Sequence, residues 1–390
     1  MLCISDKESK VMRHVLITQT MMKQYRVPFF ERLQDKLAQK EILLRVAYGD
    51  PPPLEQKKGD NIDLSPGLGL KVRNRFFYGG RVVYQPLLRE IRSADLVIVE
   101  QANKHVLNYL LLALSSLKLK KVAFWGHGLN RQARKQGASE WLKRQMLGKV
   151  DWWFAYTQGT ANYLSSQGVS RQIITAVQNS VDTAAFSGHL NKVDADVLRL
   201  AKDRYGIAEN AEIGLFCGSL YPDKHIDFLL DVAVLVKNEI PAFELVIIGN
   251  GPQIDLVNSA SQRYPWIHCI GETFGAEKAA FFKMANVFLN PGLIGLAILD
   301  AFTAGLPVIT TNVPIHSPEI EYLKNGENGL ITQFDRDDYA TALKHLLKNQ
   351  ELQSRLKNAA LTSSTHYSLD AMVENFASGI VNCLNRVPEV

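Results

Sequence analysis

The sequence is poor in cysteine and has no long hydrophobic run. Its four cysteines are widely spaced and form no CxxC pair or Cys/His cluster, so we expect reduced thiols and no zinc site. The longest apolar helical candidate, 106–117, is too short to cross a bilayer and fits a buried core helix. Arg13 and His14 interrupt the apolar run near the N-terminus, which is unlike a secretion signal. These absences predict a cytoplasmic protein.

A second shortage is glycine near the N-terminus. No glycine precedes Gly49, so the turn after the first predicted strand, 19–28, lacks a G-x-G-x-x-G motif. This counts against a nicotinamide or flavin dehydrogenase.

The excess of positive charge is small as well. A formal net charge of +5 suits binding of anionic small molecules or of an anionic membrane surface better than binding of nucleic acid.

What is present is an alternation of strand-like and helix-like segments. A chain of 390 residues is longer than one core usually fills, so two domains are expected. The alternation in 12–178, and again in 212–366, is typical of doubly wound parallel sheets. The polar stretch 179–211, with one charged helix, is expected to connect the domains, and 367–390 to form a closing amphipathic helix. The predicted fold class is α/β with two Rossmann-like domains.

Individual elements follow from apolar periodicity and from breaker residues. The predicted strands are 14–18, 42–47, 94–100, 121–125, 152–156, 173–177, 213–217, 244–248, 267–270, 287–289 and 308–311. The predicted helices are 25–37, 87–93, 106–117, 140–147, 158–167, 226–238, 254–263, 277–284, one from 295, 339–348, 352–363 and 369–384. Segment 50–59, rich in proline and charge, is predicted to be a loop.

One stretch, 290–312, combines a strand end, a glycine-bearing loop, a short helix and a second strand. Its loop has no bulky Cβ atoms at Gly292 and Gly295, so backbone N–H groups can approach a ligand there. A helix starting at Gly295 would add unpaired N–H donors and partial positive charge, which suit a phosphate. Alternatively, the glycines only allow the helix to pack tightly on the strand.

Two further turns in the same half suit a phosphate. Gly218 and Ser219 follow one predicted strand, with Lys224 close behind, and 249–252 follows the next strand. Because the carboxyl ends of parallel strands share one edge of a sheet, three such loops predict a nucleotide site. Lys224 would place a positive charge on a diphosphate, unless it is only a solvated lysine at a helix start.

Asp300 and His127 are the other candidate site residues. Asp300 lies among apolar residues, where an unpaired carboxylate is costly, and a ribose diol would satisfy it. The alternative is an exposed acid on a helix. His127 lies between two glycines at the end of a predicted strand, so it can approach a substrate closely and titrate near neutral pH. A lone histidine can equally be structural.

Charged clusters elsewhere have a surface interpretation. Asp194 and Asp196 form a D-x-D pair of the kind that holds a metal on nucleotide diphosphates. They fall in the charged connection, however, so a solvated surface is expected for them, as for the acids at 335–338. A basic cluster is either a solvated face or a contact with anionic lipid headgroups. It comprises Arg131, Arg134, Lys135, Lys143, Arg144 and Lys149, with Trp141, Trp152 and Trp153 nearby.

The second half resembles the donor domain of the retaining GT-B glycosyltransferases of glycosyltransferase family four. The similar segments are GSLYPDKHIDFLL at 218–230, LVIIGNGP at 245–252, NPGLIGLAILDAFTAGLPVITT at 290–311 and PEIEYLKNGENGLI at 318–331. QNSVDTAAF at 178–186 is similar to the family's interdomain N-G-V-D motif. The helix from about Tyr367 resembles the one that crosses back onto the N-terminal domain.

The resemblance implies a GT-B fold, in which two Rossmann-like domains face each other across a cleft. Lys224 matches the family's diphosphate-contacting lysine, whereas Ser219 stands where the family has an arginine. Asp300 matches the acid that contacts the ribose, and Gly292 replaces the acid that contacts the donor sugar. His127 matches the histidine beside the reacting sugar. The implied donor-binding positions are Gly218, Ser219, Lys224, Gly249, Gly251, Pro291, Gly292, Gly295, Leu296 and Asp300, and the implied catalytic ones are His127, Lys224 and Asp300.

We therefore expect a retaining, metal-independent hexosyltransferase that takes a nucleotide diphosphate sugar and needs no cofactor. The acceptor implied by the resemblance is a glycan, for example a lipid-linked oligosaccharide in surface polysaccharide or lipopolysaccharide assembly at the cytoplasmic face of the membrane. Two alternatives remain open. One is a nucleotide-sugar epimerase of GT-B type, and the other is a non-catalytic sugar-nucleotide-binding partner.

Overall fold

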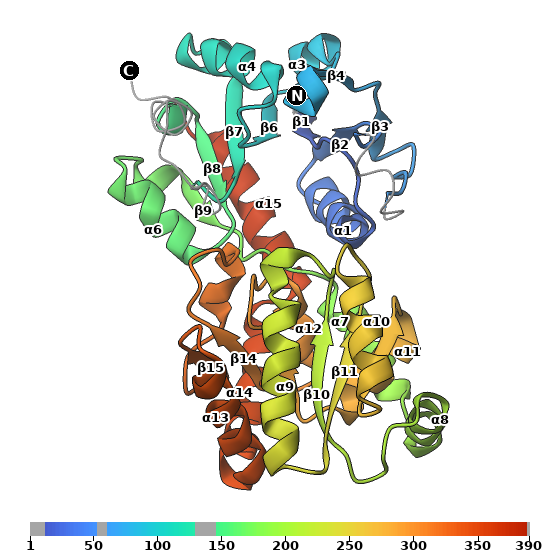
Figure 1. Cartoon of the computed structure of the whole chain (residues 1–390). Helices are drawn as coiled ribbons and strands as arrows, with labels where there is room; N and C mark the ends of the chain where they lie inside the picture. The colour runs from blue at the N-terminus through green and yellow to red at the C-terminus, as the bar shows by residue number, and fades with distance from the viewer. Residues whose placement is uncertain (1–11, 53–60, 129–145, 388–390) are drawn as a thin grey trace, which may run out of the picture. The chain divides into compact units, whose positions relative to one another are not determined.

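The computed structural model describes residues 12–52, 61–128 and 146–387. The described residues form two compact units (Figure 1). The first unit contains 12–128, 146–178 and 372–387, and the second contains 179–371. Most of the predicted helix 140–147, most of the predicted loop 50–59 and all of the basic cluster except Lys149 lie outside the described residues, while 146 and 147 are helical as predicted.

The first unit is built on a seven-stranded sheet in which every pairing is parallel, in the order β3-β2-β1-β6-β7-β8-β9. Its strands are β1 (Arg13–Thr18), β2 (Ile42–Tyr48), β3 (Gly69–Lys71), β6 (Leu96–Glu100), β7 (Lys121–Gly126), β8 (Trp152–Ala155) and β9 (Ile174–Ala176), with a separate antiparallel hairpin of β4 (Arg75–Phe77) and β5 (Val82–Tyr84). The helices are α1 (Val27–Ala38), α3 (Leu88–Ser93), α4 (Val106–Ser116), α6 (Gln158–Ser166) and α15 (Leu369–Asn385). Strands such as β8 are buried along their whole length, as expected for a parallel sheet covered on both faces.

The second unit repeats this plan with six parallel strands in the order β12-β11-β10-β13-β14-β15. They are β10 (Glu212–Cys217), β11 (Phe243–Ile248), β12 (Ile267–Gly271), β13 (Val287–Leu289), β14 (Val308–Thr311) and β15 (Gly329–Thr332). Its helices are α7 (Thr183–Lys192), α8 (Ala195–Tyr205), α9 (Ile226–Glu239), α10 (Ile254–Arg263), α11 (Gly275–Met284), α12 (Ala297–Thr303), α13 (Arg336–Lys348) and α14 (Gln350–His366). If the strands of each sheet are numbered in chain order, both sheets begin with the order 3-2-1-4-5-6 across the sheet, and the first sheet adds a seventh strand. This is the Rossmann strand order.

The predicted α/β class with two doubly wound parallel sheets is confirmed. The short strands β3, β4, β5 and β15 were not predicted, because none of them is a fully buried apolar run like the equally short β8, β13 and β14. Within the described residues, no helix is both long and apolar enough to span a bilayer.

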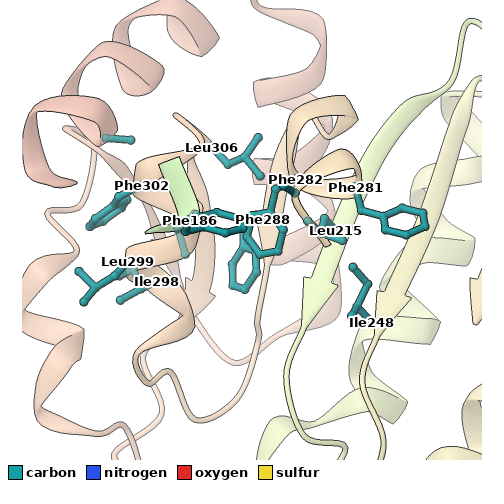
Figure 2. Packing of buried hydrophobic residues seen from close by; sticks show 14 of the residues in the cluster. Phe186, Leu215, Ile248, Phe281, Phe282, Phe288, Ile298, Leu299, Phe302 and Leu306 are labelled. Carbon is teal, nitrogen blue, oxygen red and sulfur yellow. The ribbon is translucent and has the colours of Figure 1, made fainter. Parts of the chain in front are cut away.

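The segment 179–211 differs from the expected connection with one helix. It forms two helices, α7 and α8, and both belong to the second unit. Phe186 of α7 lies in the hydrophobic core of that unit, 5.1 Å from the ring of Phe282 and in the same cluster as Phe288 (Figure 2). Periodicity within α7 is weak, so its role in the core is visible only in the tertiary structure.

The last helix, α15, belongs to the first unit from Met372 onward. Phe376 is fully buried there, stacked on Phe154 of β8 with ring centroids 4.2 Å apart. It also meets Trp125 of β7 at 5.0 Å and Phe29 of α1 at 5.3 Å. Four aromatic rings from four elements therefore fix the end of the chain to the first sheet.

Truncating this anchor should destabilise the protein strongly. Phe376→Ala removes a fully buried ring from an aromatic cluster, which costs about 3 kcal/mol or more of unfolding free energy. Urea unfolding followed by tryptophan fluorescence would measure the loss. Val387→Ala, at an exposed position close behind the helix, should change the stability by less than about 0.5 kcal/mol and serves as the control. Equal effects of the two substitutions would contradict the packing described here.

Candidate functional site

The strand order of the second sheet reverses between β10 and β13, and the predicted loops lie at this point. The loop 218–224 follows β10, the loop 249–252 follows β11 and the loop 290–296 follows β13. In open α/β sheets such a switch point leaves a crevice at the carboxyl ends of the strands, where ligands bind. The three loops predicted to share one edge of the sheet therefore do so.

Backbone hydrogen bonds tie the three loops into one unit. The Leu220 N–H donates to the Asn250 carbonyl at 2.9 Å, and the Gln253 N–H donates to the Leu220 carbonyl at 3.0 Å. On the other side, the Leu293 N–H donates to the Asp223 carbonyl at 2.7 Å. The central loop 218–224 is thus held from both sides, which fixes its geometry before any ligand arrives.

Two glycines are required by close backbone approaches rather than by a ligand. A Cβ at Gly292 would lie 2.2 Å from the Asp223 oxygen and 2.5 Å from the Lys224 carbonyl carbon. A Cβ at Gly249 would lie 1.9 Å from the Gly218 oxygen, and its φ of 142° is itself unfavourable for other residues. In this arrangement of the loops, position 292 is therefore closed to any side chain.

Lys224 lies at the centre of the loops. Its ammonium donates to the Leu293 carbonyl, so the lysine crosses from the loop after β10 to the loop after β13. Burial lowers the pKa of Lys224 to about 8. The charged form lacks a close carboxylate partner strong enough to offset burial, so it would gain from an incoming anion.

Asp300 lies in the first turn of α12 and is not free. Its Oδ2 atom is 2.6 Å from the Nζ atom of Lys278 on α11, with 15% and 21% of the two side chains exposed. Burial alone would lower the pKa of Lys278, but the charge and hydrogen bond of Asp300 together with Cys217 outweigh it and raise the pKa. The Lys278 ammonium also lies 5.0 Å from the ring of Phe186 and 5.4 Å from that of Phe282. Lys278 is thus a fixed cation that the sequence did not reveal.

The remaining loop positions are arranged by the backbone. Ser219 is exposed and Pro291 is buried. The helix expected from Gly295 begins two residues later, at Ala297, and has only seven residues, with Leu296 before its first turn. His316 supports the loop, since its Nδ1 atom accepts from the Ile294 N–H at 3.0 Å while its Nε2 atom lies 2.7 Å from the Thr311 carbonyl.

In the first unit, His127 follows β7 and is exposed. Its ring lies 5.6 Å from that of Tyr156 in an edge-on arrangement. The next residue is clamped, because the Gly128 N–H donates to the Gln101 Oε1 atom at 3.0 Å and the Gln101 amide donates back to the Gly128 carbonyl at 3.3 Å. Gln101 follows β6, so two neighbouring strand ends together position His127.

A buried polar network lies at the switch point of the first sheet, between β1 and β6. The Thr20 hydroxyl lies 3.0 Å from the Glu100 Oε2 atom and 3.1 Å from the His105 Nε2 atom. The same histidine atom is 3.3 Å from Glu100. Burial would raise the pKa of Glu100, but the hydrogen bond and charge of His105 hold it below its usual value. Glu100 therefore remains an ionised acceptor at a strand end.

The two clusters with a surface interpretation have different outcomes. Asp194 and Asp196 are exposed, and Asp194 caps α8 by accepting from the Val197 N–H at 2.9 Å. Trp152 and Trp153 are not available to a membrane, because both are buried in β8 and donate to Thr175 and Leu147. The β-strand pattern places these rings in the core, which overrides their closeness in sequence to basic residues.

Two Rossmann-like parallel sheets, each with its polar strand ends at a switch point, form the GT-B fold of glycosyltransferases. The crystal structure of Anabaena HepE in complex with UDP has this fold and matches 95% of this chain and 100% of its own, with a TM-score of 0.68 and 13% identity. The likeness at this identity concerns the fold.

The sequence comparisons agree. Residues 211–349 match the family described as glycosyl transferases group 1, and with the fold this supports a group 1 glycosyltransferase. The alpha-monoglucosyldiacylglycerol synthase of Acholeplasma laidlawii is 23% identical over 207 residues, which are 52% of this chain and 50% of that protein. The phosphatidyl-myo-inositol mannosyltransferase of Mycobacterium leprae is 28% identical over 183 residues, 45% of this chain and 48% of that protein. The chain spans about half the length of these curated relatives.

The closed position at Gly292 can be tested with a matched pair of glycines in one loop. Gly292→Ala should lower the unfolding free energy by about 2 kcal/mol or more, because the methyl group meets the backbone at Asp223 and Lys224. Gly295→Ala should be nearly neutral, since no atom lies within 4 Å of its ideal Cβ. Thermal and urea unfolding of both variants would measure the difference, and equal stability would show that the loops are not packed as described.

Proposed function

We propose that the protein is a glycosyltransferase that moves a sugar from a nucleotide diphosphate sugar to a hydroxyl of a lipid or lipid-linked glycan acceptor. The observation that carries the proposal is the set of three hydrogen-bonded loops at the switch point of the second sheet, which brings Lys224 to its centre. The match of 211–349 to group 1 glycosyl transferases covers all three loops. We further propose retention of configuration and no metal requirement, following the resemblance of these loops to family four.

Two lysines supply the charge that a diphosphate needs. Lys224 has its pKa lowered by burial, so an anion that pairs with it relieves an unfavourable charge. Lys278 provides a second cation, fixed by Asp300 on the neighbouring helix. This second cation compensates for Ser219, where the family's arginine is absent. The fourteen-residue helix α9, which begins at Ile226 just after Lys224, adds the partial positive charge of its N-terminus.

The proposed roles of these residues follow from where negative charge develops during sugar transfer. As the bond between the anomeric carbon and the diphosphate oxygen breaks, negative charge grows on the leaving diphosphate, and fixed cations and loop amides stabilise it. The acceptor hydroxyl forms the new bond and releases its proton to the leaving diphosphate. No protein nucleophile is needed. In the first unit, the exposed His127 and the ionised Glu100 offer polar groups to sugar hydroxyls.

The names of two relatives support the choice of acceptor class. A diacylglycerol glycolipid and a phosphatidylinositol appear in the names of the two relatives described above. A lipid-linked oligosaccharide in surface polysaccharide assembly has the same requirement for a hydroxyl held near a membrane. We propose an acceptor of this kind and action at the cytoplasmic face.

The function is tested first by binding and then by product. In a thermal-shift screen of UDP, GDP and ADP with their sugars, one nucleotide should stabilise the protein by mass action. Incubation of that donor sugar with extracted lipid should then give a labelled glycolipid. An altered sugar nucleotide formed from donor alone would indicate an epimerase, and stabilisation without any turnover would indicate a non-catalytic binding partner. Absence of stabilisation by every nucleotide would contradict the donor site itself.

Binding of the nucleotide diphosphate should depend on pH through Lys224. The charged lysine favours the anion, and its pKa in the free protein is about 8, so affinity should fall as pH rises through that value. Calorimetric titrations between about pH 7.5 and 9.5 should show up to about a tenfold loss per pH unit above the pKa. Lys224→Met should bind about tenfold more weakly at pH 7.5 and lose this slope. A slope that survives the substitution would assign the titration to another group.

A further inference from the structure

The helix α4 presents apolar residues to the surface as well as to the core. Leu107, Leu111 and Leu112 are buried against the first sheet. The opposite face exposes Val106, Tyr109, Leu110 and Ala113, followed by Leu117 and Leu119, which are 67% and 66% exposed. Val106, Tyr109, Leu110 and Ala113 recur at helical spacing, and Leu117 and Leu119 continue this apolar strip just beyond the end of the helix. Part of an otherwise apolar helix is thus left uncovered.

The β4–β5 hairpin extends this strip. The Val83 N–H of β5 donates to the Lys104 carbonyl at 2.7 Å, directly before α4, so the hairpin and the helix are neighbours. Phe77 and Tyr78 at the hairpin turn are exposed, and Tyr78 is 81% exposed. Leu88, at the start of α3, is exposed as well. Figure 1 shows α3, α4 and β4 at the same end of the first unit.

The same part of the chain has an excess of basic over acidic residues. Residues 72–120 contain eight basic and three acidic side chains, a balance of +5, which equals the formal net charge of the whole chain. The basic residues are Arg73, Arg75, Arg81, Arg89, Arg92, Lys104, Lys118 and Lys120, and the acidic ones are Glu90, Asp95 and Glu100. Glu100 is engaged with Thr20 and His105. All five arginines are exposed.

We infer that this surface, formed by the exposed residues of 73–92 and 104–119 and named here the α4 face, binds the headgroup region of an anionic lipid bilayer. Exposed leucine, tyrosine and phenylalanine side chains insert at the boundary of headgroups and acyl chains, and the surrounding cations pair with lipid phosphates. The charge complementarity selects the occupant. A second copy of this chain has no comparable excess of acidic residues. A surface that binds such a copy, or another protein partner, would not need this large an excess of positive charge.

The inference is separate from the proposed reaction, because it concerns binding to a membrane and not the transfer of a sugar. It also differs from the interpretation based on the basic cluster Arg131–Lys149, whose tryptophans at 152 and 153 are buried. The two groups of residues can be compared directly. Each is altered by substitutions in the full chain, and binding is measured on vesicles without any substrate.

Sedimentation with liposomes of phosphatidylcholine alone, or with about one third phosphatidylglycerol, tests the α4 face. The parent should bind the anionic liposomes more tightly, and high salt should weaken the binding. R75Q/R81Q/R89Q removes three cations, each contributing about fivefold, so binding should fall on the order of a hundredfold. Y78S/L117S should reduce it at least about tenfold on both kinds of liposome.

Matched controls lie on the second unit. K192Q/R199Q/K348Q removes three exposed cations and L200S/L256S two exposed leucines, and both should bind within about twofold of the parent. All altered side chains are exposed, so the thermal unfolding midpoints should be unchanged, which separates lost binding from misfolding.

Several results would overturn the inference. They are a parent that shows no preference for anionic liposomes, α4-face variants that bind like the parent, and loss of binding only when R134Q/K135Q/K143Q/R144Q alters the other cluster. A parent that dimerises through the α4 face and ignores liposomes would assign the surface to a second copy instead.

Discussion

The arrangement of the second unit depends on one close approach, that of the loop 218–224 to the backbone at Gly292. The Leu293 N–H bonds to the Asp223 carbonyl at 2.7 Å, and a Cβ on Gly292 would lie within 2.2 Å of the same oxygen. The strand order makes this approach unavoidable, because β10 and β13 are neighbours whose following loops leave the sheet at the same edge. Lys224 reaches its position only because the two loops touch.

This contact also determines the electrostatics of the site. Lys224, Lys278 and Asp300 converge near the end of β10, where burial raises the pKa of the Cys217 thiol to about 11 and keeps it neutral. Two cations and one carboxylate leave a net positive charge in a partly buried region. Such a charge is unfavourable without an anion, and this is the physical reason to expect a diphosphate there. An acidic side chain at position 292 would reduce that charge, and the loops leave it no room.

The strand ends of the first unit carry hydrogen-bonded and ion-paired groups instead of an excess of cations. Its strand ends carry Thr20, Glu100 and His105 in one network, and Gln101 clamps Gly128 beside His127. Hydroxyl, carboxylate and amide groups suit the hydroxyls of a glycan better than they suit a phosphate. The absence of an early glycine-rich turn, evident from the sequence, is consistent with this difference between the two units.

Local sequence patterns predicted the main strands and helices well, because continuous apolar runs such as LVIV and FELVII occur where a strand is buried on both faces. They failed where long-range packing decides. The stretch 179–211 looked like a polar connection, yet Phe186 enters the core of the second unit. Trp152 and Trp153 looked like neighbours of a basic surface, yet both lie in a central strand.

The sequence by itself determined the class of fold and the three loops of the candidate site, because periodicity, glycines and chain order are local properties that fix where strands end. Only the tertiary structure decided which side chains meet at those ends. It paired Asp300 with Lys278, closed the position at Gly292 and left the face of α4 uncovered. Each of these depends on residues that are distant along the chain, and no local pattern records how close such residues come in space.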